Sequence, residues 1–413
     1  MKKILLLLLI SGIALSFYYP IDGFKKTGIR RLVRLERILS GEIKDTKPVP
    51  GALKSTDQIR LNLMNKRGDS LGNFPKPDPV LQKKIEQLFP SMDESYSLAM
   101  MEITPGKPVR FASKKISSSY MPGSVAKLAV AAGLFTELQR LYPDSFEKRQ
   151  ELLRTRMVKA DRWCITNVHT VPFFNPESGE FFKRVVQPQD IFSLYEWADH
   201  MLSVSSNAAA SIVWKELVLM RAFGRQYPVS EAVEKNFWAT TPKDSLRVWS
   251  MEVVNAPMAK IGITKDDFWL GNLFTSEGQK MCPGQGGSKA TPAGFLQYLV
   301  AMERGLIVDP LSSLEIKKLL YITDRRIRYA ASPDLASAAL YFKSGSLYKC
   351  KDEPDFVCGK YMGNVYNYMN SVAIVEHPDG TVYMVALMSN VLRKNSANDH
   401  MALASRIDKI VRN

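Results

Sequence analysis

The spacing of apolar positions changes along the chain. A helical spacing over residues 80–88 gives way to apolar-rich runs at residues 97–104 and 109–113, which predict a β-hairpin around a Pro-Gly pair. Between about residues 144 and 290 most segments have helical spacing. In about the last seventy residues, strand-like runs return. The region from residue 80 onward therefore begins and ends with strands.

Capping residues and prolines refine these elements. We expect helices at residues 124–141, 146–157, 188–203, 207–223, 291–304 and 400–411, and late strands at residues 338–342, 371–376 and 381–387. Strands at both ends with helices between them predict an α+β fold, in which sequence-distant parts close a mixed sheet. A mostly helical lobe, at about residues 144–290, interrupts the sheet.

The first residues are typical of an export signal. Lys2 and Lys3 precede an uncharged stretch, residues 4–17, that is shorter than the roughly 20 apolar residues needed to span a bilayer. Ala14 and Ser16 offer a cleavage point. We expect residues 1–18 to be a signal peptide or an N-terminal anchor, and the protein to be periplasmic or otherwise extracytoplasmic. Membrane association through the N-terminus stays open.

Residues 19–79 are predicted to form a basic, loop-rich extension. It contains an amphipathic helix over residues 27–40 and a proline-punctuated stretch after it. The remaining residues, 80–413, form the main predicted domain.

Composition and charge restrict the partners. Hydrophobic residues make up 46% and charged residues 23% of the chain, the balance of a globular protein. The net charge of +15 predicts attraction to anions. The cations are scattered, without the aromatic-interleaved basic stretch of single-strand binders, so we expect no nucleic acid. Anionic polymers or lipids of the cell envelope are the alternative. The oligomeric state is left open.

Four cysteines, Cys164, Cys282, Cys350 and Cys358, fit an oxidising compartment. The last two flank a polar stretch and could close a small loop, although four buried free thiols are the alternative. Because no zinc-binding spacing occurs, we expect no metal and no cofactor.

Three tetrads fit the pattern Ser-x-x-Lys, beginning at Ser124, Ser145 and Ser346. Only Ser124 opens a strongly apolar helix, whose N-terminus stabilises negative charge. Lys127, one turn later, lies on the same helix face. A serine becomes a nucleophile when a base takes its proton, and a lysine can be that base when burial or nearby positive charge lowers its pKa. The alternative is a lysine that extends from a core helix to solvent.

Two further elements follow in order. Ser205-Ser206-Asn207 precedes a helix-like start, and Lys343-Ser344-Gly345-Ser346 follows a strand-like run. Taken together, the three elements resemble those of the class A β-lactamases and the D-alanyl-D-alanine peptidases over roughly residues 80–413. The resemblance implies a β-lactamase/transpeptidase-like fold: an antiparallel sheet flanked by helices, with an inserted helical lobe.

The resemblance also implies catalytic roles. Ser124 would attack a carbonyl and become acylated, with Lys127 as a base or part of a proton relay. Ser205 would pass a proton to the leaving group, and Asn207 would hold Lys127 or the substrate amide.

Lys343 and Ser344 would bind the substrate carboxylate, with Gly345 allowing close approach of the backbone. The N–H groups of Ser124 and Ser346 would form the oxyanion hole.

Some features depart from this pattern. Class A β-lactamases carry a Glu-x-x-Leu-Asn element, and neither Glu252 nor Glu277 has that context. We therefore expect no strong β-lactam hydrolysis, but acylation with slower or different deacylation. The stretch at residues 226–283, which holds Trp238, Trp249 and Trp269, is either a lid or plain packing, and packing is favoured.

The four histidines, His169, His200, His377 and His400, are expected at the surface or at helix caps, so a Ser-His-Asp hydrolase is disfavoured.

The leading hypothesis is an exported serine hydrolase that forms an acyl-enzyme on Ser124. Its substrate would be a small-molecule or peptide amide or ester of the cell envelope, a D-alanyl peptide or a β-lactam-like compound. The alternatives are a catalytically silent binding protein and an acyl- or peptidyl-transferase that uses the same acyl-enzyme.

Overall fold

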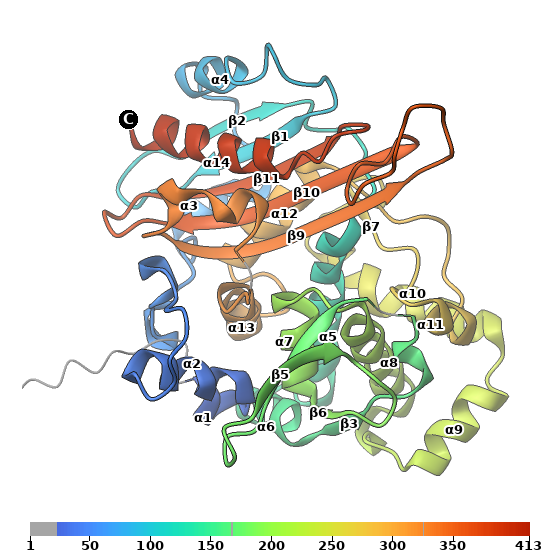
Figure 1. Ribbon diagram of the computed structural model, residues 1–413. Helices are drawn as coiled ribbons and strands as arrows, with labels where there is room; N and C mark the ends of the chain where they lie inside the picture. The colour runs from blue at the N-terminus through green and yellow to red at the C-terminus, as the bar shows by residue number, and fades with distance from the viewer. Residues whose placement is uncertain (1–22, 167, 325) are drawn as a thin grey trace, which may run out of the picture.

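A sheet lobe and a helical lobe make up the protein (Figure 1). The computed structural model describes residues 23–166, 168–324 and 326–413. The segment at residues 1–18, predicted as a signal or anchor, lies outside the described residues. None of the helices found in the described part has the length and apolar character needed to cross a membrane.

The sheet joins strands from the two ends of the main region. Its order is β2-β1-β11-β10-β9, and every neighbouring pair is antiparallel. The strands are β1 (Ser97–Glu102), β2 (Arg110–Lys114), β9 (Ala339–Lys349), β10 (Tyr366–Glu376) and β11 (Val382–Asn390). The predicted hairpin and the three late strands are thus confirmed, and the late strands are longer than expected. The mixed sheet expected from the order of elements is wrong, because no neighbouring pair is parallel among the described strands. Sequence-distant parts do close the sheet, since β1 pairs with β11.

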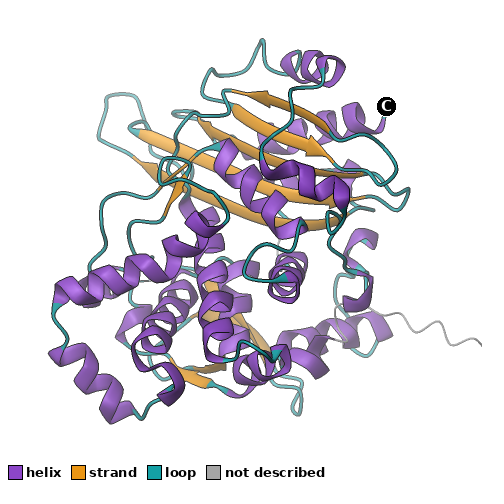
Figure 2. Cartoon of the chain, turned by 180° about the vertical axis from the view of Figure 1, so that it is seen from behind, coloured by secondary structure: helices purple, strands orange, loops and turns teal. Residues whose placement is uncertain are grey.

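Helices cover both faces of the sheet, and the pleat of β1 shows how. Leu98 and Met100 point into a core with α4 (Pro79–Glu86) and α14 (Ala397–Arg412). Ala99 and Met101, which alternate with them, face a second core that contains α12 (Pro292–Glu303). Figure 1 shows α14 across the first face, and Figure 2 shows the molecule from behind. Since both faces are covered, all six residues of β1 are buried.

The helical lobe is built around one central helix, α5 (Lys127–Leu141), which packs against α8 and α10. Gly133 allows the close approach of α10, because a Cβ there would lie 2.4 Å from the carbonyl oxygen of Val253. The other helices are α6 (Phe146–Thr155), α7 (Leu194–Ser203), α8 (Asn207–Phe223), α9 (Glu231–Thr240), α10 (Lys243–Lys260), α11 (Ser276–Met281) and α13 (Pro310–Tyr321). Short strand pairs complete it: β3 (Met157–Lys159) with β6 (Ile191–Ser193), β4 (Thr170–Phe174) with β5 (Phe181–Val185), and β7 (Phe268–Trp269) with β8 (Lys289–Ala290).

The helix predicted over residues 188–203 begins later than expected. It starts at Leu194, where Ser193 and Glu196 form a capping box. Residues 187–190 form a turn instead, because the Asp190 carboxylate accepts the backbone N–H of Gln187. The other predicted helices are confirmed to within a few residues at each end.

The segment before residue 79 packs against both lobes. It contains α1 (Gly23–Thr27), α2 (Arg30–Ser40) and α3 (Lys66–Asp69), and α2 confirms the predicted basic helix. On the helical lobe, Arg31 makes a buried two-bond ion pair with Asp199, at 2.6 Å for each bond. On the sheet lobe, Lys54 and Asn62 both bind the carboxylate of Glu376. We call residues 29–62 the N-terminal strap.

Aromatic packing explains much of the stretch at residues 226–283. The Trp238 ring contacts Trp163, with centroids 4.9 Å apart, and Trp249 stacks parallel to Phe237. The Trp269 indole donates to the carbonyl of Gln285. These contacts agree with the packing interpretation.

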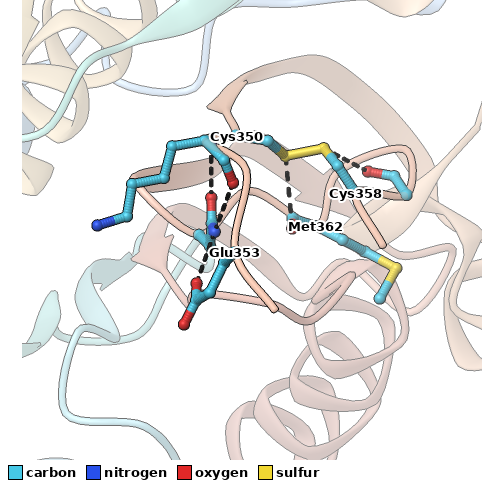
Figure 3. Close-up of a disulfide and its surroundings, with 7 residues drawn as sticks. Cys350, Glu353, Cys358 and Met362 are labelled. Atoms are coloured by element: carbon cyan, nitrogen blue, oxygen red, sulfur yellow. Dashed lines mark hydrogen bonds between the residues drawn. A yellow bond between two sulfur atoms is a disulfide. The ribbon is translucent and has the colours of Figure 1, made fainter. Parts of the chain in front are cut away.

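The cysteines divide into two kinds. Cys350 and Cys358 form a disulfide (Figure 3), which confirms the small closed loop. Cys164 and Cys282 are buried free thiols.

Candidate active site

Ser124 lies in a 3-10 turn, Gly123–Ala126, that leads into α5. Two glycines bring strand β9 against this turn. A Cβ on Gly123, which has φ +54°, would lie 2.7 Å from the backbone nitrogen of Ser346. A Cβ on Gly345 would lie 2.3 Å from the carbonyl oxygen of Pro122 and 2.8 Å from the nitrogen of Ser124. The N–H groups of Ser124 and Ser346 therefore belong to two segments in close contact.

Lys127 is completely buried, and oxygen atoms surround its side-chain nitrogen. The Nζ atom lies 2.6 Å from the carbonyl oxygen of Ser205, 2.8 Å from Oδ1 of Asn207 and 3.0 Å from Oγ of Ser124. Burial, with a contribution from the nearby charge of Lys343, holds the pKa of Lys127 well below its usual value. A neutral amine has two N–H bonds for the two fixed acceptors, which leaves its lone pair for the Ser124 hydroxyl proton.

Ser205 connects the two lysines of the site. Lys343 donates to its Oγ at 2.7 Å, and the Nζ of Lys127 lies 3.4 Å from the same oxygen. Its backbone has φ +64°, a left-handed conformation that costs a non-glycine residue free energy and clusters at functional sites. The next residue, Ser206, caps α8 by accepting the N–H of Ala209 at 3.1 Å, which fixes Asn207 at the first position of that helix.

Lys343 is the second buried cation. Burial, with a contribution from the charge of Arg328, lowers the pKa of Lys343 to about 7. Its side chain reaches a cleft of about 320 Å³ between β9 and the helical lobe. Seven predicted site residues line this cleft: Ser124, Ser205, Asn207, Lys343, Ser344, Gly345 and Ser346. The structure thus brings the whole predicted set together, with Lys127 beneath the floor.

Sequence reasoning missed an arginine in this site. Arg328, which is buried, donates to the carbonyl of Gly345 and to Oγ of Ser346, at 2.9 Å in each case. Its backbone also has a positive φ, +54°. No motif surrounds Arg328 in the sequence, so only the fold places it against β9.

Sequence reasoning also missed Phe274. The Nζ of Lys127 lies 4.9 Å from the centre of the Phe274 ring. The two glutamates considered above make ion pairs elsewhere: Glu252 with Arg221 at 3.5 Å, and Glu277 with Arg162 at 2.7 Å. The side chain beside the buried Lys127 amine is thus the Phe274 ring, and neither of these two glutamates.

Other candidates are distinguished by their surroundings. Ser145 caps α6 by accepting the N–H of Lys148, and Lys349 is exposed on β9.

The surface placement expected for the histidines is wrong for three of them, because His200, His377 and His400 are buried. His377 binds Asp408 at 2.6 Å, and His400 lies between two serines of the sheet. Among the described residues, no three His, Cys, Asp or Glu side chains are grouped to hold a metal ion.

Comparisons with known proteins agree with this geometry. The sequence model described as "Beta-lactamase enzyme family" matches residues 80–412. No curated protein sequence matches the chain.

Solved structures match over most of their length. PBP-A is 13% identical with a TM-score of 0.52, covering 82% of this chain and 97% of that one. A class A β-lactamase from Bacteroides cellulosilyticus is 15% identical with a TM-score of 0.52, covering 81% and 98%. The extended-spectrum β-lactamase TLA-3 is 12% identical with a TM-score of 0.53, covering 80% and 97%. At these identities the likeness shows the fold, an antiparallel sheet with a helical lobe of the β-lactamase/transpeptidase type.

Proposed function

Because the chain belongs to the beta-lactamase enzyme family, we propose that it is an exported serine hydrolase that forms an acyl-enzyme on Ser124. The substrate is an amide or ester of the cell envelope, of the D-alanyl peptide or β-lactam class. Family membership supports serine hydrolase chemistry in general. The observation that carries the specific mechanism is the position of Lys127, buried without a carboxylate and 3.0 Å from the Ser124 hydroxyl.

Acylation begins with proton transfer. Neutral Lys127 takes the Ser124 hydroxyl proton while Oγ forms a bond to the substrate carbonyl carbon. The carbonyl π electrons move to its oxygen, which the N–H groups of Ser124 and Ser346 stabilise. One such donor is typically worth about 3 kcal/mol.

The tetrahedral intermediate then loses its leaving group. The bond from the carbonyl carbon to the leaving nitrogen or oxygen breaks, and the Ser205 hydroxyl gives that atom a proton. Ser205 recovers a proton from Lys127, 3.4 Å away, so the lysine is neutral again. Lys343 and Arg328 supply positive charge for a carboxylate on the substrate, beside Ser344 and Ser346.

Slow deacylation follows from the environment of Lys127. Among the described residues the Phe274 ring, and not a carboxylate, packs beside the amine, so none of their acidic side chains is placed there to activate water against the acyl ester. A variant of the structural neighbour PBP-A has been solved as an acyl-enzyme complex with penicillin G. We infer that the acyl-enzyme of this protein persists for minutes or longer.

Intact-protein mass spectrometry after exposure to a fluorescent penicillin tests the proposal. We expect a persistent adduct on the parent and none on Ser124→Ala. The variant Lys127→Met should slow adduct formation by about 10²- to 10⁴-fold, the usual contribution of a general base. Ser145→Ala is the control, because Ser145 opens another Ser-x-x-Lys tetrad that does not line the cleft. This variant should react like the parent. A parent without any adduct, or an adduct that survives Ser124→Ala, would contradict the proposal.

A further inference from the structure

The loop between β9 and β10, residues 350–365, is fastened at several points. The disulfide closes its first half, and the Asn364 side chain bonds to both the N–H and the carbonyl of Lys351, at 2.9 and 3.0 Å. Asn364 also donates to Glu353, as Figure 3 shows. Glu353 in turn pairs with Arg393, beyond the end of β11, at 2.6 Å. Covalent and polar contacts therefore hold a loop that lacks a substantial apolar core.

This loop reaches the cleft through one aromatic residue. Tyr361 lines the same cavity as Ser124 and Lys343. Its backbone has φ +59°, a conformation that an aromatic residue keeps only when its surroundings fix it. The disulfide and the Asn364 contacts, on either side of Tyr361 in the sequence, provide that restraint.

Tyr361 packs against the residue that organises β9. The Arg328 guanidinium lies 5.0 Å from the centre of the Tyr361 ring, while it donates to Gly345 and Ser346. Tyr348 contacts the same ring edge-on, with centroids 5.8 Å apart. The aromatic ring thus stands beside the cationic end of the cleft.

Apolar side chains continue this wall. Ile327 and Leu347 line the cleft, and 37% and 41% of their surfaces are exposed. Exposed apolar groups gathered around polar catalytic residues mark a ligand surface. The end of the cleft that attracts a carboxylate therefore also presents an apolar, partly aromatic side.

We infer that Tyr361, held over Arg328 by the Cys350–Cys358 disulfide, is a specificity-determining residue that favours substrates with a planar apolar group next to their carboxylate. This inference rests on the proposed function, because it describes the substrate of the same cleft. Tyr361 contacts the substrate, and the disulfide acts by positioning Tyr361.

The test compares two cephalosporins that differ only beside the ring carboxylate, with a styryl group in one and a methyl group in the other. Their dissociation constants are measured with Ser124→Ala, and their acylation rates with the intact nucleophile. Stacking on Tyr361 should favour the styryl compound about 3- to 10-fold. Tyr361→Ala and the double variant Cys350→Ser/Cys358→Ser should abolish this preference, whereas Tyr361→Phe should keep it. Val357→Ala, in the same loop with a side chain 88% exposed, is the matched control.

The outcomes separate the two proposals. An unchanged styryl-to-methyl ratio in Tyr361→Ala overturns the inference, even if the parent is acylated normally. A ratio that falls in Tyr361→Ala but not in the double cysteine variant overturns the positioning role of the disulfide. Binding with the expected preference but without acylation contradicts the proposed function and supports the inference. Failure of both compounds to bind overturns both.

Discussion

Two lysines of this protein are equally buried and have opposite electrostatics. Lys127, beneath the floor of the cleft, and Lys317, at the junction of α13 with the sheet, are both fully buried. Neutral oxygens of Ser205, Asn207 and Ser124 surround Lys127. Lys317 faces two carboxylates instead, those of Glu303 and Glu376, the latter at 2.7 Å.

The difference shows that the partners, and not burial alone, decide the charge of a buried amine. Burial opposes the charge of Lys317, but Glu303 and Glu376 raise its pKa above the usual value. Around Lys127, no carboxylate in the described part of the chain compensates the desolvation, and the charge of Lys343 adds to it, so the pKa of Lys127 falls. The surroundings of Lys317 therefore favour the charged ammonium, whereas those of Lys127 favour the neutral amine.

The largest effect should come from Lys317→Met. It leaves the Glu303 carboxylate buried without its cation, and breaking a buried ion pair in this way costs about 3–5 kcal/mol of unfolding free energy. Urea denaturation measures this loss. The acylation rate of the folded fraction should stay within about twofold of the parent, because Lys317 does not line the cleft.

Lys127→Met is the matched comparison for stability. Lys127→Met removes an amine with no carboxylate partner among the described residues, so it leaves no buried carboxylate without a cation. We therefore expect a smaller loss of unfolding free energy than in Lys317→Met, and equal losses in both variants would contradict this expectation.

Asn207→Asp should give Lys127 a carboxylate neighbour, as Lys317 has. It places a carboxylate about where Oδ1 of Asn207 lies, 2.8 Å from Nζ. An adjacent negative charge raises a lysine pKa by about 1–3 units, so acylation at pH 7 should fall about 10- to 10³-fold and recover as the pH rises. Stopped-flow acylation from pH 6 to 10 measures both. Asn236→Asp, on the exposed side of α9, adds the same charge and should leave the profile unchanged. A profile that does not move in Asn207→Asp would exclude Lys127 as the base.

A pH change alone should separate the cleft from the buried ion pairs. Lys343 titrates at about pH 7, so its positive charge disappears as the pH rises from 6 to 8. The affinity of Ser124→Ala for a carboxylate-bearing penicillin should therefore fall roughly tenfold over this range. Titration calorimetry measures the change, and Lys343→Arg, which keeps its charge, should give a flat profile.

The effect of Lys343 on folding stability has the opposite pH dependence to its effect on ligand affinity. The folded protein releases the Lys343 proton near pH 7, whereas the unfolded chain holds it to about pH 10.5. Unfolding free energy from this residue should therefore rise between those values and be lost as the pH falls through 7. Lys317 has the opposite dependence: because folding raises its pKa, its stabilisation is fully present below about pH 10.5 and is lost only at higher pH.

Local signals in the sequence are sufficient to locate the residues that line the cleft. Each of the three sequence elements lies at the start of a helix or inside a strand, where capping residues, prolines and apolar runs are visible. The helix after Ser205-Ser206-Asn207 was predicted with its observed ends, Asn207–Phe223. The error at α7 also had a visible signal, since Ser193 and Glu196 have capping-box spacing.

Residues that act through distant contacts could not be predicted in this way. Arg328 reaches β9 across a turn of irregular chain, and Phe274 reaches Lys127 from a loop more than a hundred residues away. The buried histidines were misplaced for the same reason. His377 is buried because Asp408, on the last helix, provides its partner. Such pairs are determined by tertiary packing, which no local pattern encodes.

The N-terminal strap restricts how the cleft can open. It is tied by Arg31 to the helical lobe and by Lys54 and Asn62 to the sheet lobe. A hinge rotation that widened the gap between the lobes would have to break either the buried Arg31–Asp199 ion pair or the part-buried contacts of Lys54 and Asn62 with Glu376. Rotation of the two lobes as rigid bodies is therefore unfavourable in free energy. Substrate entry and product release then depend on small movements of the loops that border the cleft.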